Sequence, residues 1–213
     1  MSKILSNKNN LQVLFEDNHI IIVNKRAGDI VQGDKTGDKP LSDVVKEYIK
    51  DKYNKPGNVF LGTVHRLDRP TSGLVIFAKT SKVLPRLNKL FLSKDIQKTY
   101  WALVKNEPAK KEDTLIHWLK KNPKNNKSLA HPKEVTDSKK GILHYKLIKK
   151  LDTYALLEIN LETGRHHQPA PLCEHGMARK KGAAPLVYWV FRGEPVAACP
   201  NEIRGARMGR RAA

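Results

Sequence analysis

One stretch of this sequence, residues 64–76, reads Val64-His65-Arg66-Leu67-Asp68-Arg69-Pro70-Thr71-Ser72-Gly73-Leu74-Val75-Ile76. It places a single carboxylate, Asp68, between Arg66 and Arg69, ahead of an apolar run. Nearby positive charge favours the ionised form of an acid, and an ionised aspartate suits a nucleophile or electrostatic stabiliser better than a general acid near neutral pH. The pattern alone fits equally a solvated surface cluster of small energetic value.

Short runs of apolar and β-branched residues flank this stretch and predict strands. They cover residues 11–15, 19–24, 59–64 and 74–78. The first two predict a hairpin, and the last two enclose residues 64–76 as a loop whose rigid frame can aim a side chain. Apolar residues at a helical period predict helices over residues 41–49 and 83–91. The glycines and charges of residues 25–39 predict an exposed loop.

The second half of the chain predicts further strands, most of them in hairpin pairs. They cover residues 96–104, 115–119, 141–148 and 154–161. Residues 120–140 are rich in lysine, asparagine and serine without periodicity, which predicts a basic loop that either contacts RNA or is merely solvated. Many strands in hairpins with two helices favour an α+β fold, a mostly antiparallel sheet with flanking helices and loops.

The charge balance points to a polyanionic partner. The 213 residues carry 40 lysines and arginines against 21 acidic residues, a net charge of +19. This excess favours nucleic acid ahead of a membrane surface, although a lysine-rich genome would explain part of it. Cys173 and Cys199 lack the spacing of a disulfide framework or a zinc site. Without a secretory signal or a membrane-spanning run, we expect a soluble, cytoplasmic monomer.

Two further motifs follow the Asp68 stretch in order. Lys98-Thr99-Tyr100 begins a predicted strand, and Leu161-Glu162-Thr163-Gly164-Arg165-His166-His167-Gln168 ends one. Together with His65-Arg66-Leu67-Asp68 and Thr71-Ser72-Gly73-Leu74, they resemble the three motifs of the RluA-type family of RNA pseudouridine synthases. Each motif alone is modest, but all three in order are highly specific. The resemblance covers about residues 11–168 and implies the pseudouridine synthase fold.

The resemblance implies a catalytic role for three residues. Asp68 would be the nucleophile that lets a uridine base detach, rotate and rejoin through carbon. Arg165 would pair with Asp68, and a carboxylate nucleophile in a partly desolvated site does need a fixed cation. Tyr100 would stack on the target uracil, because a base flipped out of RNA needs an aromatic or apolar platform. Without its motif, Tyr100 on a strand is more often a core aromatic.

The remaining motif residues are expected to bind the substrate RNA. Arg66 would help to displace or replace the flipped base. The others are His65, Leu67, Lys98, Thr163, Gly164, His167 and Gln168. The histidines of these motifs have no cysteine or acidic partner at metal-ligand spacing, so no metal site is predicted. The implied reaction requires neither a metal nor an organic cofactor.

The resemblance breaks after Gln168. The family normally continues with Ile-Arg and a helix, then Gly-Asp and Tyr-Gly stretches, whereas this chain reads Pro169-Ala170-Pro171, and closely spaced prolines oppose a helix. Arginine also replaces lysine as the main basic residue. We expect residues 1–168 to form a partial catalytic domain and residues 169–213 to be a frameshifted segment or a divergent, partly disordered tail. Within that tail, residues 187–191 are a strand candidate.

Two functions follow from these patterns. The first is an RNA pseudouridine synthase that acts on a ribosomal or transfer RNA stem-loop. The alternative is a basic RNA-binding protein that keeps the fold but has lost catalysis with its native C-terminal part. Larger family members carry a small N-terminal RNA-binding domain, which we expect to be absent because the first strand begins near residue 11. Recognition would then fall to the catalytic domain and its basic loops.

Overall fold

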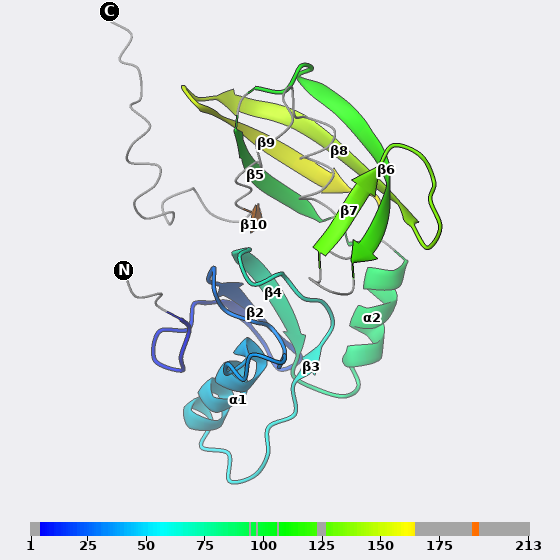
Figure 1. Ribbon diagram of the computed structural model, residues 1–213. Coiled ribbons are helices and arrows are strands. Elements are labelled where there is room, and N and C mark those ends of the chain that lie inside the picture. Colours follow the sequence, from blue (N-terminus) through cyan, green and yellow to red (C-terminus); the bar gives the residue numbers. More distant parts are fainter. Residues whose placement is uncertain are drawn as a thin grey trace, which may run out of the picture. The chain divides into compact units, whose positions relative to one another are not determined.

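A computed structural model describes residues 5–93, 95–96, 98–105, 107–122, 127–164 and 189–191, with the backbone alone for 127 and 189–191. The chain divides into two compact units, residues 1–97 and 98–213. Each unit is built on its own antiparallel sheet (Figure 1). The predicted α+β fold with mostly antiparallel pairing is confirmed.

The first unit contains a four-stranded sheet in the order β1-β2-β4-β3. Its strands are β1 (Val13–Glu16), β2 (Ile20–Lys25), β3 (Gly62–Thr63) and β4 (Gly73–Ala78). The predicted hairpin is confirmed, because β1 pairs with β2 across a turn in which Asp17 caps the backbone amides of His19 and Ile20, both at 2.7 Å. β2 and β4 form the buried centre of the sheet, with Ile21 and Val75 fully inaccessible.

Two helices accompany this sheet, as the apolar periodicity predicted. α1 (Leu41–Lys52) buries Leu41, Val44, Val45 and Ile49, a spacing of three and four residues that places them on one helical face. α2 (Leu84–Leu92) has a proline in its first turn, where the missing amide costs no helical hydrogen bond. It approaches β3 closely, since a Cβ on Gly62 would lie 2.7 Å from Leu84 Cδ1.

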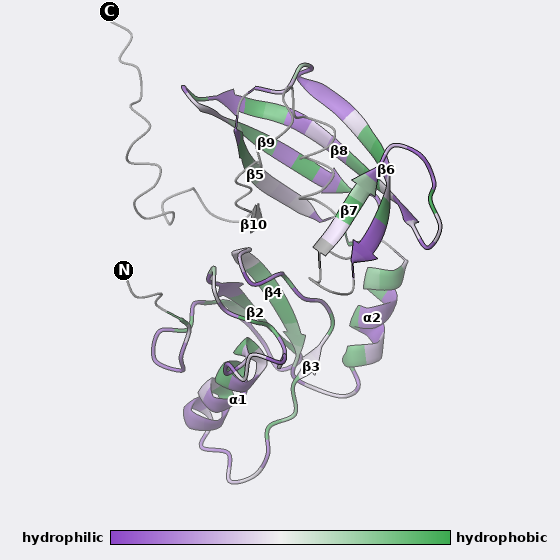
Figure 2. Ribbon diagram, viewed as in Figure 1, coloured by the Kyte–Doolittle hydropathy of each residue, from purple (hydrophilic) through white to green (hydrophobic). Residues whose placement is uncertain are grey.

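The second unit contains a six-stranded sheet in the order β10-β5-β9-β8-β6-β7. The strands are β5 (Thr99–Lys105), β6 (Glu112–Asn122), β7 (Lys127–His131), β8 (Lys139–Lys150), β9 (Tyr154–Leu161) and β10 (Trp189–Phe191). Buried and more exposed residues alternate along much of β6, β8 and β9. Apolar and polar residues are interspersed along these strands (Figure 2). One face of this sheet therefore carries the core and the other does not.

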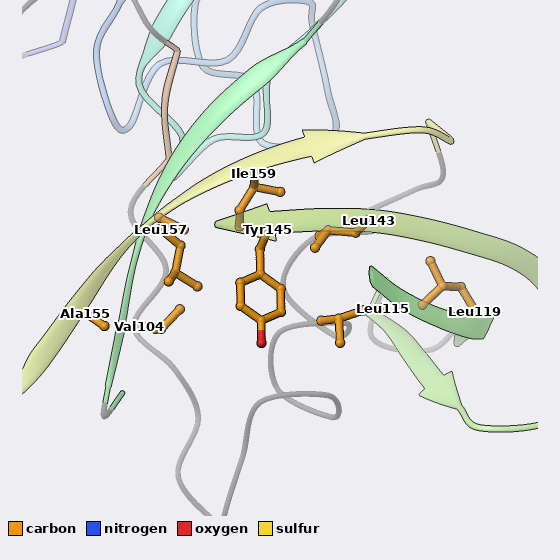
Figure 3. Close-up of a cluster of buried hydrophobic side chains, with 9 residues drawn as sticks. Val104, Leu115, Leu119, Leu143, Tyr145, Ala155, Leu157 and Ile159 are labelled. Carbon is orange, nitrogen blue, oxygen red and sulfur yellow. The ribbon is translucent and has the colours of Figure 1, made fainter. Parts of the chain in front are cut away.

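That core is a single cluster on one face of the second sheet (Figure 3). Leu143, Leu157 and Ile159 are fully inaccessible, and Leu115 and Leu119 of β6 are nearly so. Tyr145 joins them with its ring among the aliphatic side chains (Figure 3). β8 and β9, which supply most of these residues, are the predicted hairpin of residues 141–161.

Three predictions of local structure are wrong. Residues 120–140 are not one loop, because β6 continues to Asn122 and pairs with β7; an edge strand tolerates lysines, since one side of it meets water. The strand predicted for residues 59–64 is reduced to the two residues of β3. Residues 25–39 are not uniformly exposed, because Lys25 and Asp29 are buried.

The C-terminal segment is described only at β10. There the predicted strand is confirmed for residues 189–191, which pair antiparallel with Tyr100, Trp101 and Ala102 of β5. The other residues from 165 onward lie outside the described part of the chain. In the part that is described, no helix has both the length and the apolarity to span a membrane.

Candidate active site

The loop between β3 and β4 holds Asp68 in a half-buried position. Its neighbours alternate in environment: Arg66 is exposed to solvent, whereas Leu67 is buried with 7% of its surface accessible. The Thr71 amide donates to the Asp68 carbonyl oxygen at 3.0 Å, which closes a turn directly after the aspartate. The backbone therefore presents the carboxylate from a tight turn anchored by a buried leucine.

A fully buried lysine lies beneath this turn. Lys25, the last residue of β2, has no accessible surface. Its Nζ donates to the carbonyl oxygens of Arg26 and Asp68 at 3.1 Å, of Arg69 at 3.3 Å and of Thr71 at 2.6 Å. A single ammonium thus fixes the backbone at Asp68 and over the three residues that follow it. Such a support restricts the direction in which the Asp68 side chain points.

Burial lowers the pKa of Lys25 to about 8, although the charges of Asp29 and Asp68 oppose that shift and favour the ammonium. Asp29 is itself 6% exposed and accepts hydrogen bonds from the Ser6 amide at 2.9 Å and the Ser6 hydroxyl at 2.6 Å. The Arg26 amide donates to the same carboxylate at 3.2 Å. This buried region therefore pairs one cation with carboxylates and carbonyl dipoles, as a buried charge requires.

Two glycines allow the loop to sit against β2. Gly28 and Gly73 have φ angles of +104° and +133°, a region that residues with a Cβ rarely adopt. The Gly28 amide donates to the Arg69 carbonyl oxygen at 2.7 Å, and Gly73 begins β4 opposite Lys25. Glycine at these positions lets the turn approach the strand that carries the supporting lysine.

Arg69, the residue that follows Asp68, makes ion pairs with the loop of residues 34–38. Its guanidinium bonds to Asp38 at 2.5 Å, to Asp34 at 3.4 Å and to the Thr36 hydroxyl at 2.8 Å. These hydrogen bonds and charges raise the pKa of Arg69. Arg69 therefore ties the loop of residues 34–38 to the turn.

His65 connects the loop to α2. Its Nε2 accepts a hydrogen bond from the Ile76 amide at 3.0 Å, so the Nε2 atom carries no proton. Its ring stacks on Phe91 with centroids 4.7 Å apart and an interplanar angle of 26°. This packing positions the start of the motif, and the predicted contact of His65 with RNA stays a prediction.

The other motif residues belong to the second unit. Tyr100 lies in β5 opposite Ile159 and packs against the buried cluster with part of its surface accessible. Burial lowers the pKa of Lys98. Thr163 follows β9, and its hydroxyl accepts a hydrogen bond from the Ile142 amide at 2.9 Å. That bond fixes the backbone just before Gly164, and residues 165–168 follow it.

The structure thus brings together His65, Leu67 and Asp68 in one unit, and Lys98, Tyr100 and Thr163 each have a defined place in the other. Arg165, His166, His167 and Gln168 lie outside the described residues, so their predicted roles stay predictions. Among the described residues, no three histidine, cysteine, aspartate or glutamate side chains group as metal ligands would.

Lys25 is the important residue that sequence reasoning missed. Lysine is almost never fully buried unless it is paired, so residues 25–39 read as an exposed loop. The sequence nevertheless contained a signal for the burial of Lys25. Ile21, Val23 and Lys25 occupy every second position of one strand. A strand places such residues on one face, and the first two of them are apolar.

The chain belongs to the RNA pseudouridylate synthase family, whose model matches residues 19–169. That range contains the Asp68 loop, Lys25, Tyr100 and Thr163. The match ends one residue after Gln168, where the composition of the chain also changes. The expected RluA-type membership is therefore confirmed.

Curated relatives include enzymes named for two kinds of RNA. The chain is similar to the ribosomal large subunit pseudouridine synthase D of Zymomonas mobilis, with 33% identity over 162 residues, covering 74% of this chain and 50% of that protein. It is also similar to the tRNA pseudouridine synthase C of Vibrio vulnificus, with 31% identity over 171 residues, covering 74% and 66%. The chain spans about half the length of several curated relatives it matches.

Solved structures share the fold. The human RNA pseudouridylate synthase domain containing 4 matches with a TM-score of 0.66 and 20% identity over 78% of this chain and 64% of that chain. The human RNA pseudouridylate synthase domain containing 1 matches with a TM-score of 0.66 and 16% identity, over 88% and 79%. At these identities the likeness establishes the fold, and the chemistry must be argued from the residues of this chain.

Proposed function

We propose that this chain is an RNA pseudouridine synthase whose nucleophile is Asp68. The observation that carries the proposal is the family match over a segment in which the Asp68 turn is held from below by Lys25. The relatives named for ribosomal and transfer RNA support a substrate of that class. We place the activity in residues 1–168, acting as a monomer in the cytoplasm on an RNA stem-loop.

The reaction exchanges one glycosidic bond for another. The bond between C1′ of the ribose and N1 of uracil breaks, the base rotates, and a bond from C1′ to C5 forms. N1 gains a proton and C5 loses one, so no other reactant is consumed. Asp68 serves as the nucleophile whose attack on the nucleoside lets the base detach. The Lys25 bonds to the Asp68 and Thr71 carbonyl oxygens keep that carboxylate in place through both bond changes.

Three further residues have separate proposed roles in the reaction. Arg165 pairs with Asp68 and keeps it ionised, because a nearby guanidinium stabilises a carboxylate. Tyr100 provides a ring on which the uracil stacks after it leaves the RNA helix, a step that costs a few kcal/mol. Arg66, exposed in front of the turn, takes the place that the flipped base vacates.

Release of tritium tests this proposal. Transcripts of ribosomal and transfer RNA that carry tritium at uracil C5 are incubated with the full chain, and tritium in water is measured. We expect release by the natural protein and none above background with Asp68→Asn, which keeps the shape of the side chain but removes its charge. Release by the Asp68→Asn variant at the natural rate would contradict the role of Asp68.

A second function, RNA binding without catalysis, is favoured by one observation. The family match ends at residue 169, and the sequence beyond it departs from the pattern that the resemblance implies. A chain that has lost part of its catalytic domain would still carry 40 lysines and arginines for phosphates. Absence of tritium release from every RNA tested, together with affinity that falls steeply with salt, would establish this alternative.

A further inference from the structure

The outer face of the second sheet carries a tryptophan between two basic strands. Trp118 lies in β6, directly opposite His131 of β7 and Lys140 of β8. Its neighbours Leu115 and Leu119 belong to the buried cluster. Trp118 lies three positions after Leu115 and one position before Leu119. Because both offsets are odd, the alternation of a strand places Trp118 on the opposite face. The indole is half-buried there.

Cationic side chains surround this indole. Lys140 Nζ lies 5.7 Å from the centroid of the Trp118 ring, within the range of a cation–π contact. Lys120 is exposed two residues further along the same face of β6. Among the residues from Trp118 to Lys140 whose side chains the structure describes, five exposed lysines stand against two exposed acidic residues, Glu134 and Asp137. This part of the surface is therefore strongly positive and also presents an aromatic ring.

Exposed apolar side chains extend the same surface. Ile116, two residues before Trp118, is 44% exposed, and Leu129 of β7, opposite Lys120, is 55% exposed. A surface with apolar groups beside lysines can bind a partner that has one flat, apolar part and one anionic part. A nucleotide has this composition, since its base has a π face and its phosphate a charge.

Tyr53 of the first unit is a second aromatic ring with lysines nearby. Tyr53 is also exposed, and the Nζ atoms of Lys79, Lys52 and Lys55 lie 5.0, 5.5 and 5.9 Å from its ring centroid. Two of those lysines, however, bind Glu16, at 2.7 Å for Lys79 and 2.8 Å for Lys52. The single negative charge of Glu16 thus offsets one of the three positive charges near Tyr53.

We propose that Trp118 is a stacking platform for one base of a single-stranded segment of the RNA, with Lys120 and Lys140 neutralising the phosphates on either side. The proposal rests on the proposed function, because it assigns a second contact surface to the same RNA substrate. It is independent of the Asp68 turn, which lies in the other unit. The surface binds a base that is not being modified and so adds affinity and register to substrate recognition.

Fluorescence anisotropy of a labelled twelve-nucleotide oligouridine tests the platform with the full chain. We expect Trp118→Leu to weaken binding about tenfold, in keeping with the typical contribution of one stacked base, and Trp118→Phe to stay within about threefold of the natural protein. Tyr53→Leu is the matched control and should leave affinity unchanged. Lys120→Gln combined with Lys140→Gln should reduce the slope of log affinity against log salt concentration by about 1.4, since each phosphate contact to a single strand contributes about 0.7, whereas Lys82→Gln should not change it.

An abasic oligomer of the same length separates stacking from charge. The natural protein and Trp118→Leu should bind it equally. Equal affinity of both proteins for oligouridine, or a similar loss by Trp118→Leu for the abasic oligomer, would overturn the platform. Tritium release tests the proposed function separately. If Trp118→Leu binds oligouridine as tightly as the natural protein and the natural protein releases tritium, only the stacking platform is contradicted. If the natural protein releases no tritium but Trp118→Leu binds oligouridine more weakly, the binding surface is supported and the catalytic proposal is contradicted.

Discussion

Lys25 gives the Asp68 turn its rigidity, and it does so through the backbone. Its ammonium donates to four carbonyl oxygens, and three of these belong to residues 68, 69 and 71. A side chain attached to such a turn loses little freedom when it reacts, because its backbone is already ordered. The supporting residue is therefore forty-three positions away in sequence from the residue that it positions.

Replacing Lys25 with methionine should destabilise the first unit. Methionine fills a similar volume but leaves buried carbonyl oxygens without their donor, which costs about 1–3 kcal/mol for an unsatisfied group. We expect the free energy of unfolding at pH 7 to fall by about 2 kcal/mol, measured by urea denaturation. Lys8→Met is the control, since Lys8 makes an exposed ion pair with Asp51 and should change stability by less than about 0.5 kcal/mol.

The same lysine predicts a pH dependence with a definite sign. The folded-state pKa of about 8 lies below the unfolded value of about 10.4. Between these values the unfolded chain binds more protons, so this group makes the free energy of unfolding rise with pH. The stability of the natural protein relative to Lys25→Met should therefore increase from pH 8 to pH 10. A difference that stays constant over this range would contradict the burial of a titrating ammonium.

At the scale of elements, Glu16 ties β1 to α1 and β4. Its side chain is 6% exposed and binds Lys52 of α1 at 2.8 Å and Lys79, the residue after β4, at 2.7 Å. The Tyr53 hydroxyl adds a hydrogen bond at 3.0 Å. Burial by itself raises the pKa of Glu16, but the hydrogen bonds from these lysines and from Tyr53 outweigh it and lower the pKa to about 2.

Glu16→Gln should remove an acid-sensitive part of the stability. Because the folded pKa lies below the unfolded value, the carboxylate contributes its full stabilisation above about pH 5 and loses it as the pH falls toward 2. The shift corresponds to about 3 kcal/mol. We expect the difference in the free energy of unfolding between the natural protein and Glu16→Gln to become smaller from pH 7 to pH 4 and to pH 3. Urea denaturation at each pH measures this difference. A difference in unfolding free energy that stays constant over these pH values would contradict the prediction. Glu47→Gln, which removes an exposed ion pair with Lys39, serves as the control.

Several elements could be predicted from the sequence because their patterns are local. β2, β4, α1 and the hairpin of β8 with β9 follow from apolar alternation or helical spacing. β7 and the end of β6 could not, since Lys120 and Lys121 break the apolar pattern and the strand depends on pairing across a hairpin. β3 is shorter than predicted, and within it Gly62 approaches Leu84 of α2, a contact that no local pattern reveals.

The sequence motifs indicate the candidate residues of the site but not the contacts that support them. Asp68 and Tyr100 stand in motifs with recognisable spacing, and both are placed by the structure. Lys25 and the Arg69 bridge to Asp34 and Asp38 arise from long-range contacts between charged residues. A charged residue in a sequence is normally expected to be exposed to solvent. The burial of Lys25 and the ion pairs of Arg69 therefore become visible only in the tertiary structure.

At the scale of the whole molecule, the family match and the composition change at the same place. The match ends at residue 169, and beyond it arginine, alanine, glycine and proline predominate. We predict that the coding DNA downstream of codon 168, translated in another reading frame, yields the Ile-Arg, Gly-Asp and Tyr-Gly continuation of the family. Sequencing the gene and translating all frames provides the measurement. A region without that continuation in any frame would contradict the frameshift and leave a divergent tail.

The central claim is that this chain makes pseudouridine in RNA through Asp68. The most direct measurement is a map of pseudouridines in the ribosomal and transfer RNA of the source organism, with the gene present, deleted and restored. We predict that deletion removes pseudouridine from one or a few defined positions, and that the natural gene restores them while Asp68→Asn does not. A map that deletion leaves unchanged, or that Asp68→Asn restores in full, would contradict the claim.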